Sequence, residues 1–260
     1  MRNLLAVVVL MAAAPVLGQT CSLPADLYRQ RVQLDRRYSK EVGNDYSKNQ
    51  STADGILREQ RAIDGVYLSY ITQVANGTLE TIHGCCPSSL RDPVALKVCA
   101  LSLYIKTGRK SAALFTASVP RDQASADSLW KLDEIVYSQR PELEKDKVPF
   151  HPLGPVSTYL DELDKLVVSG NDDAIRRYLG LFELAHGDAA EQMEDDAEKL
   201  FLRKPALIAE KWNIIRDHHK VLAILDQMMS EGDKHQAVSS ILTECSARNL
   251  NCDGLSSSLK

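Results

Sequence analysis

Long apolar runs are scarce in this chain of 260 residues. The one uninterrupted run covers residues 4–14, and the next candidate, 94–105, is broken by Lys97. Because a membrane-spanning helix needs about 20 apolar residues, we expect no membrane span once the first segment has been removed. Basic residues are not in surplus either, since 31 Lys and Arg face 35 Asp and Glu, for a net charge of −4. This balance excludes a protein that binds nucleic acid through clustered positive charge.

Recognisable catalytic motifs are also absent. The sequence has no Gly-x-Ser-x-Gly elbow, no His-Glu-x-x-His zinc motif, no calcium-binding loop and no glycine fingerprint for dinucleotides. The stretch 107–111, Thr-Gly-Arg-Lys-Ser, resembles the end of a phosphate-binding loop but lacks its upstream glycine. We interpret it instead as the end of a helix, where cationic side chains complement the helix dipole. We therefore expect a protein that is not an enzyme and holds no cofactor.

Residues 1–18 have the three parts of an export signal. Arg2 gives a positive start, residues 4–14 form the apolar core, and Val16 and Gly18 are the small residues that a signal peptidase requires. We predict a signal peptide that is cleaved after Gly18, and a mature protein that is secreted or periplasmic. The sequence leaves a bacterial and a eukaryotic source both open.

Six cysteines follow this segment, and an even set in an oxidising compartment predicts disulfides rather than free thiols. They are Cys21, Cys85, Cys86, Cys99, Cys245 and Cys252. Spacing can only rank the fifteen possible pairings. Cys245 and Cys252 lie apart from the rest with a polar turn between them, which favours a local bridge.

The other four cysteines are expected to pair among themselves. Cys85 and Cys86 are adjacent and do not readily bridge each other, so one of them should reach Cys99 and the other Cys21. A zinc site formed by His83 with Cys85, Cys86 and Cys99 is the competing interpretation. Its ligand types suit zinc, but zinc sites usually present pairs of ligands two to four residues apart.

Apolar residues recur at three- and four-residue steps through most of the chain, and no alternating run is long enough for a strand. We predict an all-α protein. The first helix should follow Pro24, and the second should begin after a Ser51-Thr52 cap. A third should begin at Asp92 with proline in its first turn. Further helices are expected at 111–117, 125–140, 156–168, 172–185, 189–202, 205–216, 220–230 and 234–247, with Ser169-Gly170, His186-Gly187 and Gly232 among the stops.

Four prolines between positions 141 and 155 interrupt this pattern, because proline removes an amide donor and blocks a continuous helix. We therefore divide the mature chain into four parts. They are a disulfide-linked helical region at 19–140, a proline-rich connection at 141–155, a second helical region at 156–252, and a flexible tail at 253–260.

The second region contains six amphipathic helices of about a dozen residues each, joined by short turns. This rhythm, over residues 150–250, resembles the stacked hairpins of helical-repeat proteins of the HEAT, armadillo and tetratricopeptide types. The resemblance rests on spacing alone, and the signature residues of tetratricopeptide repeats are missing. It implies antiparallel helical hairpins in a solenoid-like stack, and the same leucine spacing also suits an irregular helical bundle.

Two Glu-x-x-His patterns, Glu80 with His83 and Glu183 with His186, place a carboxylate and an imidazole three residues apart. Ferritin-like di-iron bundles use two such pairs together with glutamates from two further helices. Both histidines precede a glycine, so each is expected in the last turn of its helix, where a cation complements the helix dipole. A metalloprotein or metal-dependent hydrolase built on these four residues is an alternative to our prediction of no bound metal.

A helical surface without catalytic motifs is typical of a protein- or peptide-binding module or scaffold, and this is the function we expect. A carrier of small apolar ligands between helices is a second alternative. Two triplets, which begin at Asn49 and Asn76, match the acceptor pattern for N-linked sugar and matter only in a eukaryotic source.

Overall fold

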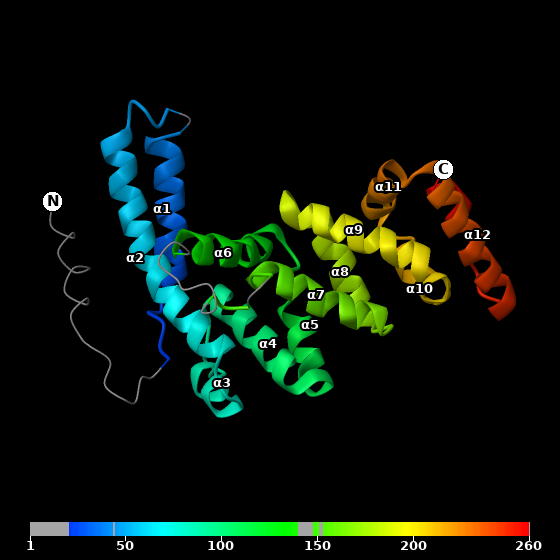
Figure 1. Cartoon of the computed structure of the whole chain (residues 1–260), viewed down its shortest axis with the longest axis horizontal. Coiled ribbons are helices and arrows are strands. Elements are labelled where there is room, and N and C mark those ends of the chain that lie inside the picture. Colours follow the sequence, from blue (N-terminus) through cyan, green and yellow to red (C-terminus); the bar gives the residue numbers. More distant parts are fainter. Residues whose placement is uncertain (1–20, 44, 140–147, 151–152, 260) are drawn as a thin grey trace.

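The computed structural model describes residues 21–43, 45–139, 148–150 and 153–259. All regular secondary structure in these ranges is helical, without a single strand, so the all-α prediction is confirmed. The helices form an elongated array (Figure 1). None of the helices in the described ranges is long and apolar enough to cross a membrane.

The helices follow one another along the chain. They are α1 (Leu27–Glu41), α2 (Gln50–Ala75), α3 (Leu79–Cys85), α4 (Pro93–Thr107), the short 3-10 helix η2 (Gly108–Ser111), α5 (Ala112–Ser118), α6 (Gln123–Gln139), α7 (Pro155–Val168), α8 (Asp172–Leu184), α9 (Asp188–Arg203), α10 (Pro205–Ile215), α11 (His219–Met228), α12 (Glu231–Arg248) and α13 (Leu255–Ser258). The hairpin of α1 and α2 lies at one end of the array and α12 at the other (Figure 1).

Helix α2 is the central packing element of the first half. It packs against α1, α4 and α6, and it buries Tyr67, Tyr70, Ile71 and Val74 along one side. This three- and four-residue spacing is the amphipathic pattern from which the helix was predicted. A small separate cluster, which includes Leu34, fills the outer end of the α1–α2 hairpin.

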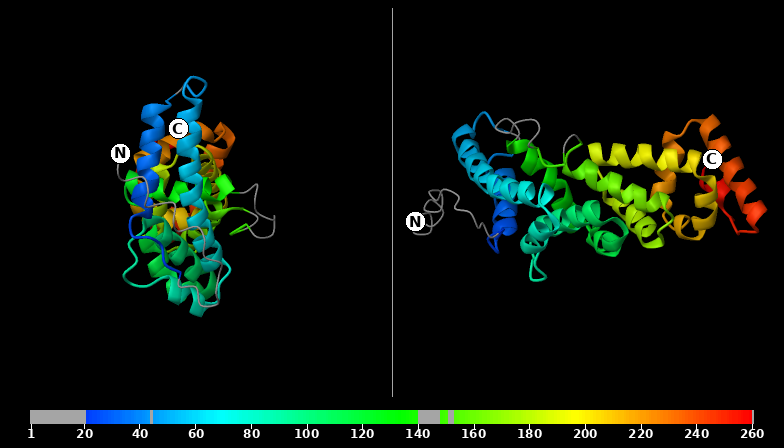
Figure 2. Two further views of the ribbon diagram at one scale, coloured as in Figure 1. Left: turned by 90° about the vertical axis from the view of Figure 1, so that its left-hand side faces the viewer. Right: turned by 60° about the horizontal axis from the view of Figure 1, so that its bottom comes forward.

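In the second half, helices two positions apart along the chain pack against each other. The pairs are α7 with α9, α8 with α10, α9 with α11, and α10 with α12. Such packing buries the apolar face of each helix against its neighbours, as in stacked hairpins. The array is elongated in Figure 1 and in the right-hand view of Figure 2, and we describe it as an elongated helical bundle. The regular repeat of a solenoid stays a prediction.

The two predicted regions share one core. A connected set of buried apolar side chains runs from Leu27 in α1 to Leu259 beyond α13, and α7 packs against both α4 and α6. Most of the connection predicted at 141–155 lies outside the described residues. It joins halves that are packed together rather than two units with separate cores.

Two predicted helix starts had different outcomes. Asp92 caps α4 as expected, because its Oδ1 accepts hydrogen bonds from the backbone N–H groups of Val94 and Ala95 at 3.0 and 2.9 Å. The Ser51-Thr52 cap is wrong, because α2 already begins at Gln50. The backbone carbonyl of Asn49 accepts the first helical bond, from the N–H of Ala53.

The prediction that Gly232 ends a helix is also wrong. Helix α11 ends at Met228, and Ser230 caps α12 by accepting a hydrogen bond from the N–H of Asp233 at 3.2 Å. Gly232 therefore lies in the first turn of α12. The Ser-x-x-Asp spacing is a helix-start signal, and here it outweighs an isolated glycine.

Residues 253–259 are ordered by packing, which corrects the expectation of a flexible tail. Leu255 is fully buried and Leu259 nearly so, and the Trp212 Nε1–H group donates a hydrogen bond to the carbonyl of Asp253 at 3.0 Å. Leucines four residues apart lie on one face of a helical turn. That spacing was the available signal in the sequence.

Candidate functional site

Three disulfides pair the cysteines in the expected way. They are Cys21–Cys85, Cys86–Cys99 and Cys245–Cys252, with Cα–Cα distances of 4.7, 5.9 and 6.3 Å. All six cysteines lie within the described residues, and none of them is free. Because zinc is held by thiolates, this pairing leaves no thiolate ligands for the competing zinc site with His83.

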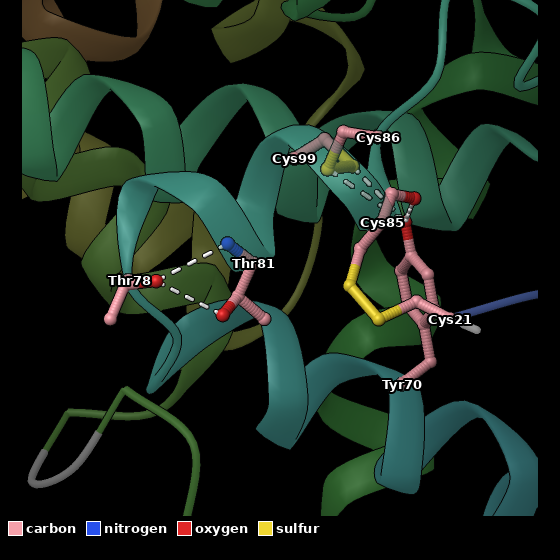
Figure 3. Close-up of a disulfide and its surroundings, with 7 residues drawn as sticks. All are labelled: Cys21, Tyr70, Thr78, Thr81, Cys85, Cys86 and Cys99. Carbon is pink, nitrogen blue, oxygen red and sulfur yellow. Dashed lines mark hydrogen bonds between the residues drawn. A yellow bond between two sulfur atoms is a disulfide. The ribbon is translucent and has the colours of Figure 1, made fainter. Parts of the chain in front are cut away.

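Tyr70 connects the first two disulfides. Its hydroxyl donates a hydrogen bond to the carbonyl of Cys85 at 3.0 Å and lies 3.1 Å from the Sγ atom of Cys99 (Figure 3). Burial raises the pKa of this hydroxyl, and the charge of Asp92 adds to the effect, so it stays a neutral donor. The cluster ties the start of the described chain, α3 and α4 to α2, which makes it a brace.

The Glu-x-x-His residues do not assemble into one site. Glu80 and His83 lie in α3, with His83 in the last turn as predicted. Helix α8 ends at Leu184, so His186 lies beyond the helix rather than in its last turn, and that part of the prediction is wrong. In the described part of the chain, no group of three or more His, Cys, Asp or Glu side chains is arranged to hold a metal ion.

Glu183 instead pairs with a histidine that the motif did not include. Its Oε1 lies 2.9 Å from Nδ1 of His218, just before α11. Lys220 donates a hydrogen bond to the backbone carbonyl of the same glutamate. These contacts join the end of α8 to the start of α11. His186 lies elsewhere, with its ring edge-on to Trp130 at a centroid distance of 6.0 Å.

A lysine–serine contact is the feature that most resembles catalytic machinery. Lys97 in α4 donates a hydrogen bond from Nζ to Oγ of Ser128 in α6 at 2.7 Å, and burial lowers the pKa of Lys97 to about 8. A serine activated by a neighbouring base is a known nucleophile. However, Ser128 is 0% exposed and its hydroxyl donates to the carbonyl of Ser125. A substrate cannot reach it, so we interpret the pair as structural.

Negative charge is concentrated on α7, α8 and α9. Residues 155–203 contain twelve acidic and five basic residues. The pKa of Asp164 in α7 reflects this negative charge. Burial and the nearby charges of Asp196 and Asp161 raise it to about 6. Lys199 opposes the shift. Because its pKa is raised, the charged form of Asp164 opposes folding at neutral pH.

A hollow in the second half runs along α12. It has a volume of about 790 Å³ and lies between α12 and the chain that returns through α13. Val238 and Leu242 lie one turn apart on the α12 side, and Leu259 lies on the opposite side. Four hydroxyl-bearing residues and three more polar ones complete the lining: Ser239, Thr243, Ser246, Ser256, Glu231, Lys234 and His235. We call this hollow the α12 groove.

The wall of the α12 groove that α13 provides is fixed in place. The Cys245–Cys252 disulfide and the Trp212–Asp253 hydrogen bond hold the returning chain against the bundle. Leu255 anchors it in the core. The sequence predicted the disulfide but not the groove, because the groove depends on a segment that was expected to be a flexible tail.

Charges in the α12 groove compensate one another. Lys234 Nζ lies 3.2 Å from an oxygen of Asp226 and 3.0 Å from one of Glu231, at the end of the groove where α12 begins. The middle of the groove is lined by apolar and hydroxyl groups. Leu242 remains 38% exposed there, so its apolar surface is available for contact.

A small cavity lies between α8, α9 and α10. Its volume is about 20 Å³, and its apolar lining includes Tyr178, Phe201 and Ile208. A space of this size holds about one water molecule. It gives no support to a carrier of apolar ligands.

Comparisons with protein-family models, curated proteins and solved structures found no match to this chain.

Proposed function

We propose that this chain is exported and that it binds a segment of another protein, or a peptide, in the α12 groove. Export is supported by the signal-like pattern of residues 1–18 and by three disulfides, which suit an oxidising compartment. No cofactor or catalytic group enters the proposal.

The observation that carries the proposal is the shape and lining of the groove. From Glu231 to Ser246 it follows α12 for roughly 22 Å, at 1.5 Å per residue. An extended segment of about seven residues spans that length. Val238, Leu242 and Leu259 offer apolar contact, and the hydroxyls along both walls offer hydrogen bonds to the backbone of a bound segment.

The charge pattern selects the kind of segment. Because Lys234 is already paired with Asp226 and Glu231, a strongly charged ligand gains little there and would lose hydration on binding. We therefore assign the groove to an uncharged segment with apolar side chains at alternate positions, as in an extended strand.

Site-specific photo-crosslinking tests this proposal. A photoreactive phenylalanine analogue replaces Leu242. The full chain is expressed in its native host, and crosslinking is carried out in the exported fraction. The same analogue at Leu114, which is exposed on α5, serves as the control. We expect a discrete adduct at position 242 whose sequenced segment is apolar and uncharged. An equal yield of adducts at both positions, or no adduct at 242, contradicts the proposal.

The two alternatives lack such an observation. The four Glu-x-x-His residues do not form one metal-binding group within the described residues, and the apolar cavity of about 20 Å³ is smaller than a ligand. Elemental analysis for iron and zinc, and mass spectrometry of an organic extract of the purified protein, check each of them independently.

A further inference from the structure

We propose that Asn76 accepts an N-linked oligosaccharide when the chain passes through a eukaryotic secretory pathway. The inference rests on the export proposed above and does not depend on the α12 groove. It concerns the turn between α2 and α3, where the triplet Asn76-Gly77-Thr78 lies.

Gly77 and Thr78 have structural roles in this turn. A side chain at Gly77 would place its Cβ atom 2.6 Å from the carbonyl oxygen of Gln73 and 2.9 Å from Cβ of Thr81, so only glycine fits. Thr78 caps α3, since its Oγ1 accepts a hydrogen bond from the N–H of Thr81 at 3.2 Å (Figure 3). Both residues are explained without any modification.

The side chain of Asn76 has no such role. The residue follows the last turn of α2, where its backbone N–H donates to the carbonyl of Thr72. Its side chain is exposed and forms no hydrogen bond within the described residues. A bulky hydrophilic group on the Asn76 amide nitrogen would extend into solvent without disturbing the cap at Thr78 or the close packing at Gly77.

The second triplet offers a contrast within the same chain. Asn49 is partly buried in the turn before α2, and Gln50 and Ser51 already belong to the helix. Asn49 is therefore less accessible than Asn76, which is exposed. The geometry therefore favours Asn76 as the acceptor.

Transfer of the sugar to Asn76 forms one bond and breaks another. Nδ2 of Asn76 forms a bond to the anomeric carbon of an oligosaccharide donated as a lipid diphosphate. The bond from that carbon to the phosphate oxygen breaks and the lipid diphosphate leaves. The proton that the amide nitrogen loses ends on this diphosphate. No oxidant or metal of this chain takes part.

Expression in a eukaryotic secretory host tests the proposal. The chain is produced with its own residues 1–18 and, in parallel, with a leader of the host, so that Asn76 meets the transferase even if the native leader fails. Secretion with the native leader reports on export alone. Sugar at Asn76 of the protein made with the host leader shows that this residue accepts the oligosaccharide. Intact mass before and after treatment with peptide N-glycosidase reads the modification, and peptide mapping locates it.

Four variants separate modification from folding. Asn76→Gln should lose the mass shift, and Asn49→Gln should keep it. Thr78→Ser keeps both the acceptor triplet and the cap, so the sugar should remain. Thr78→Asp keeps a capping oxygen and destroys the triplet, so the sugar should disappear while the melting temperature of the enzymatically deglycosylated protein stays the same. Wild-type protein secreted with the host leader and without sugar at Asn76, or a shift that depends on Asn49 alone, overturns the proposal.

Discussion

The guanidinium of Arg31 in α1 donates a hydrogen bond from Nε to Oδ1 of Asp64 in α2 at 2.8 Å, with both residues almost fully buried. Arg31 is 5% exposed and Asp64 is 1% exposed. Burial opposes the charge on Arg31, but the hydrogen bond and the charge of Asp64 outweigh it, so the pKa of Arg31 is raised. Ser138 in α6 adds a hydrogen bond to the other carboxylate oxygen at 3.0 Å. The ion pair and the hydrogen bond from Ser138 therefore join three helices.

Replacement of Asp64 by Asn should destabilise the protein strongly. The variant removes the most buried carboxylate that Arg31 contacts and leaves Asp35 and Glu134 as its partners, so the free energy of unfolding should fall by about 1–3 kcal/mol. Urea denaturation at pH 7 measures it. Glu41→Gln, which removes the partly exposed partner of Arg37, is the control and should cost about 0.5 kcal/mol or less. Equal losses of free energy in the two variants would show that the buried Arg31–Asp64 pair contributes no more to stability than an exposed ion pair.

Replacement of Lys97 by Met should stabilise the protein at pH 7. The pKa of Lys97 is about 8 in the fold, against 10.5 for a lysine in the unfolded chain, so the unfolded chain binds more protons between these values. Stability of the wild type therefore rises with pH across that window, by about 3 kcal/mol for this group. The advantage of Lys97→Met should be largest at pH 7 and should shrink towards pH 10.

Thermal melting of the Lys97→Met variant at pH 7, 8, 9 and 10 checks this expectation. Lys106→Met, at an exposed position of the same helix, is the matched control and should follow the wild type at every pH. An advantage of Lys97→Met that stays constant with pH would mean that Lys97 is not held with a lowered pKa.

Replacement of Asp164 by Asn should also stabilise the protein at pH 7. Its pKa is raised from 3.8 to about 6 by burial, by Asp196 and by Asp161. Between these values the fold keeps a proton that the unfolded chain has released, so the stability that this group provides falls as pH rises from about 4 to 6. The gain should vanish at pH 3. Melting curves of Asp164→Asn and of the exposed Asp195→Asn, measured from pH 3 to pH 7, separate this local effect from a general change of charge.

The disulfides should differ in their contribution to stability. Cys21–Cys85 spans a sequence separation of 64 residues and Cys245–Cys252 one of 7. In the chain-entropy description, removal of the first should cost about 4 kcal/mol and removal of the second about 2.5 kcal/mol. Paired Cys→Ala variants in urea titrations give the comparison. A larger loss for the short loop would contradict it.

Local patterns in the sequence predicted much of this fold. The spacing of buried side chains in α2, the Asp92 cap and the pairing of adjacent Cys85 and Cys86 with different partners follow from short-range rules of geometry. Gly170 also follows the end of α7 as expected, in a left-handed conformation with φ of +81° that favours glycine. Such features need only a few neighbouring residues.

Contacts between distant residues could not be predicted in this way. Lys97 meets Ser128 and Glu183 meets His218 across 31 and 35 positions of sequence, and only the packing of helices brings them together. The α12 groove likewise depends on Leu259 returning to α12. The Glu-x-x-His spacing indicates His186 as a local partner of Glu183, but His186 lies beyond the end of α8.

Binding of the crosslinked partner segment to purified protein tests the central claim most directly. The segment identified at position 242 is made as a synthetic peptide, and its dissociation constant is measured by calorimetry for the wild type, Leu242→Glu and Leu114→Glu. We predict that Leu242→Glu, which places an unpaired charge in the α12 groove, weakens binding at least tenfold, while Leu114→Glu on α5 leaves it unchanged. Equal affinity for all three proteins would contradict the account.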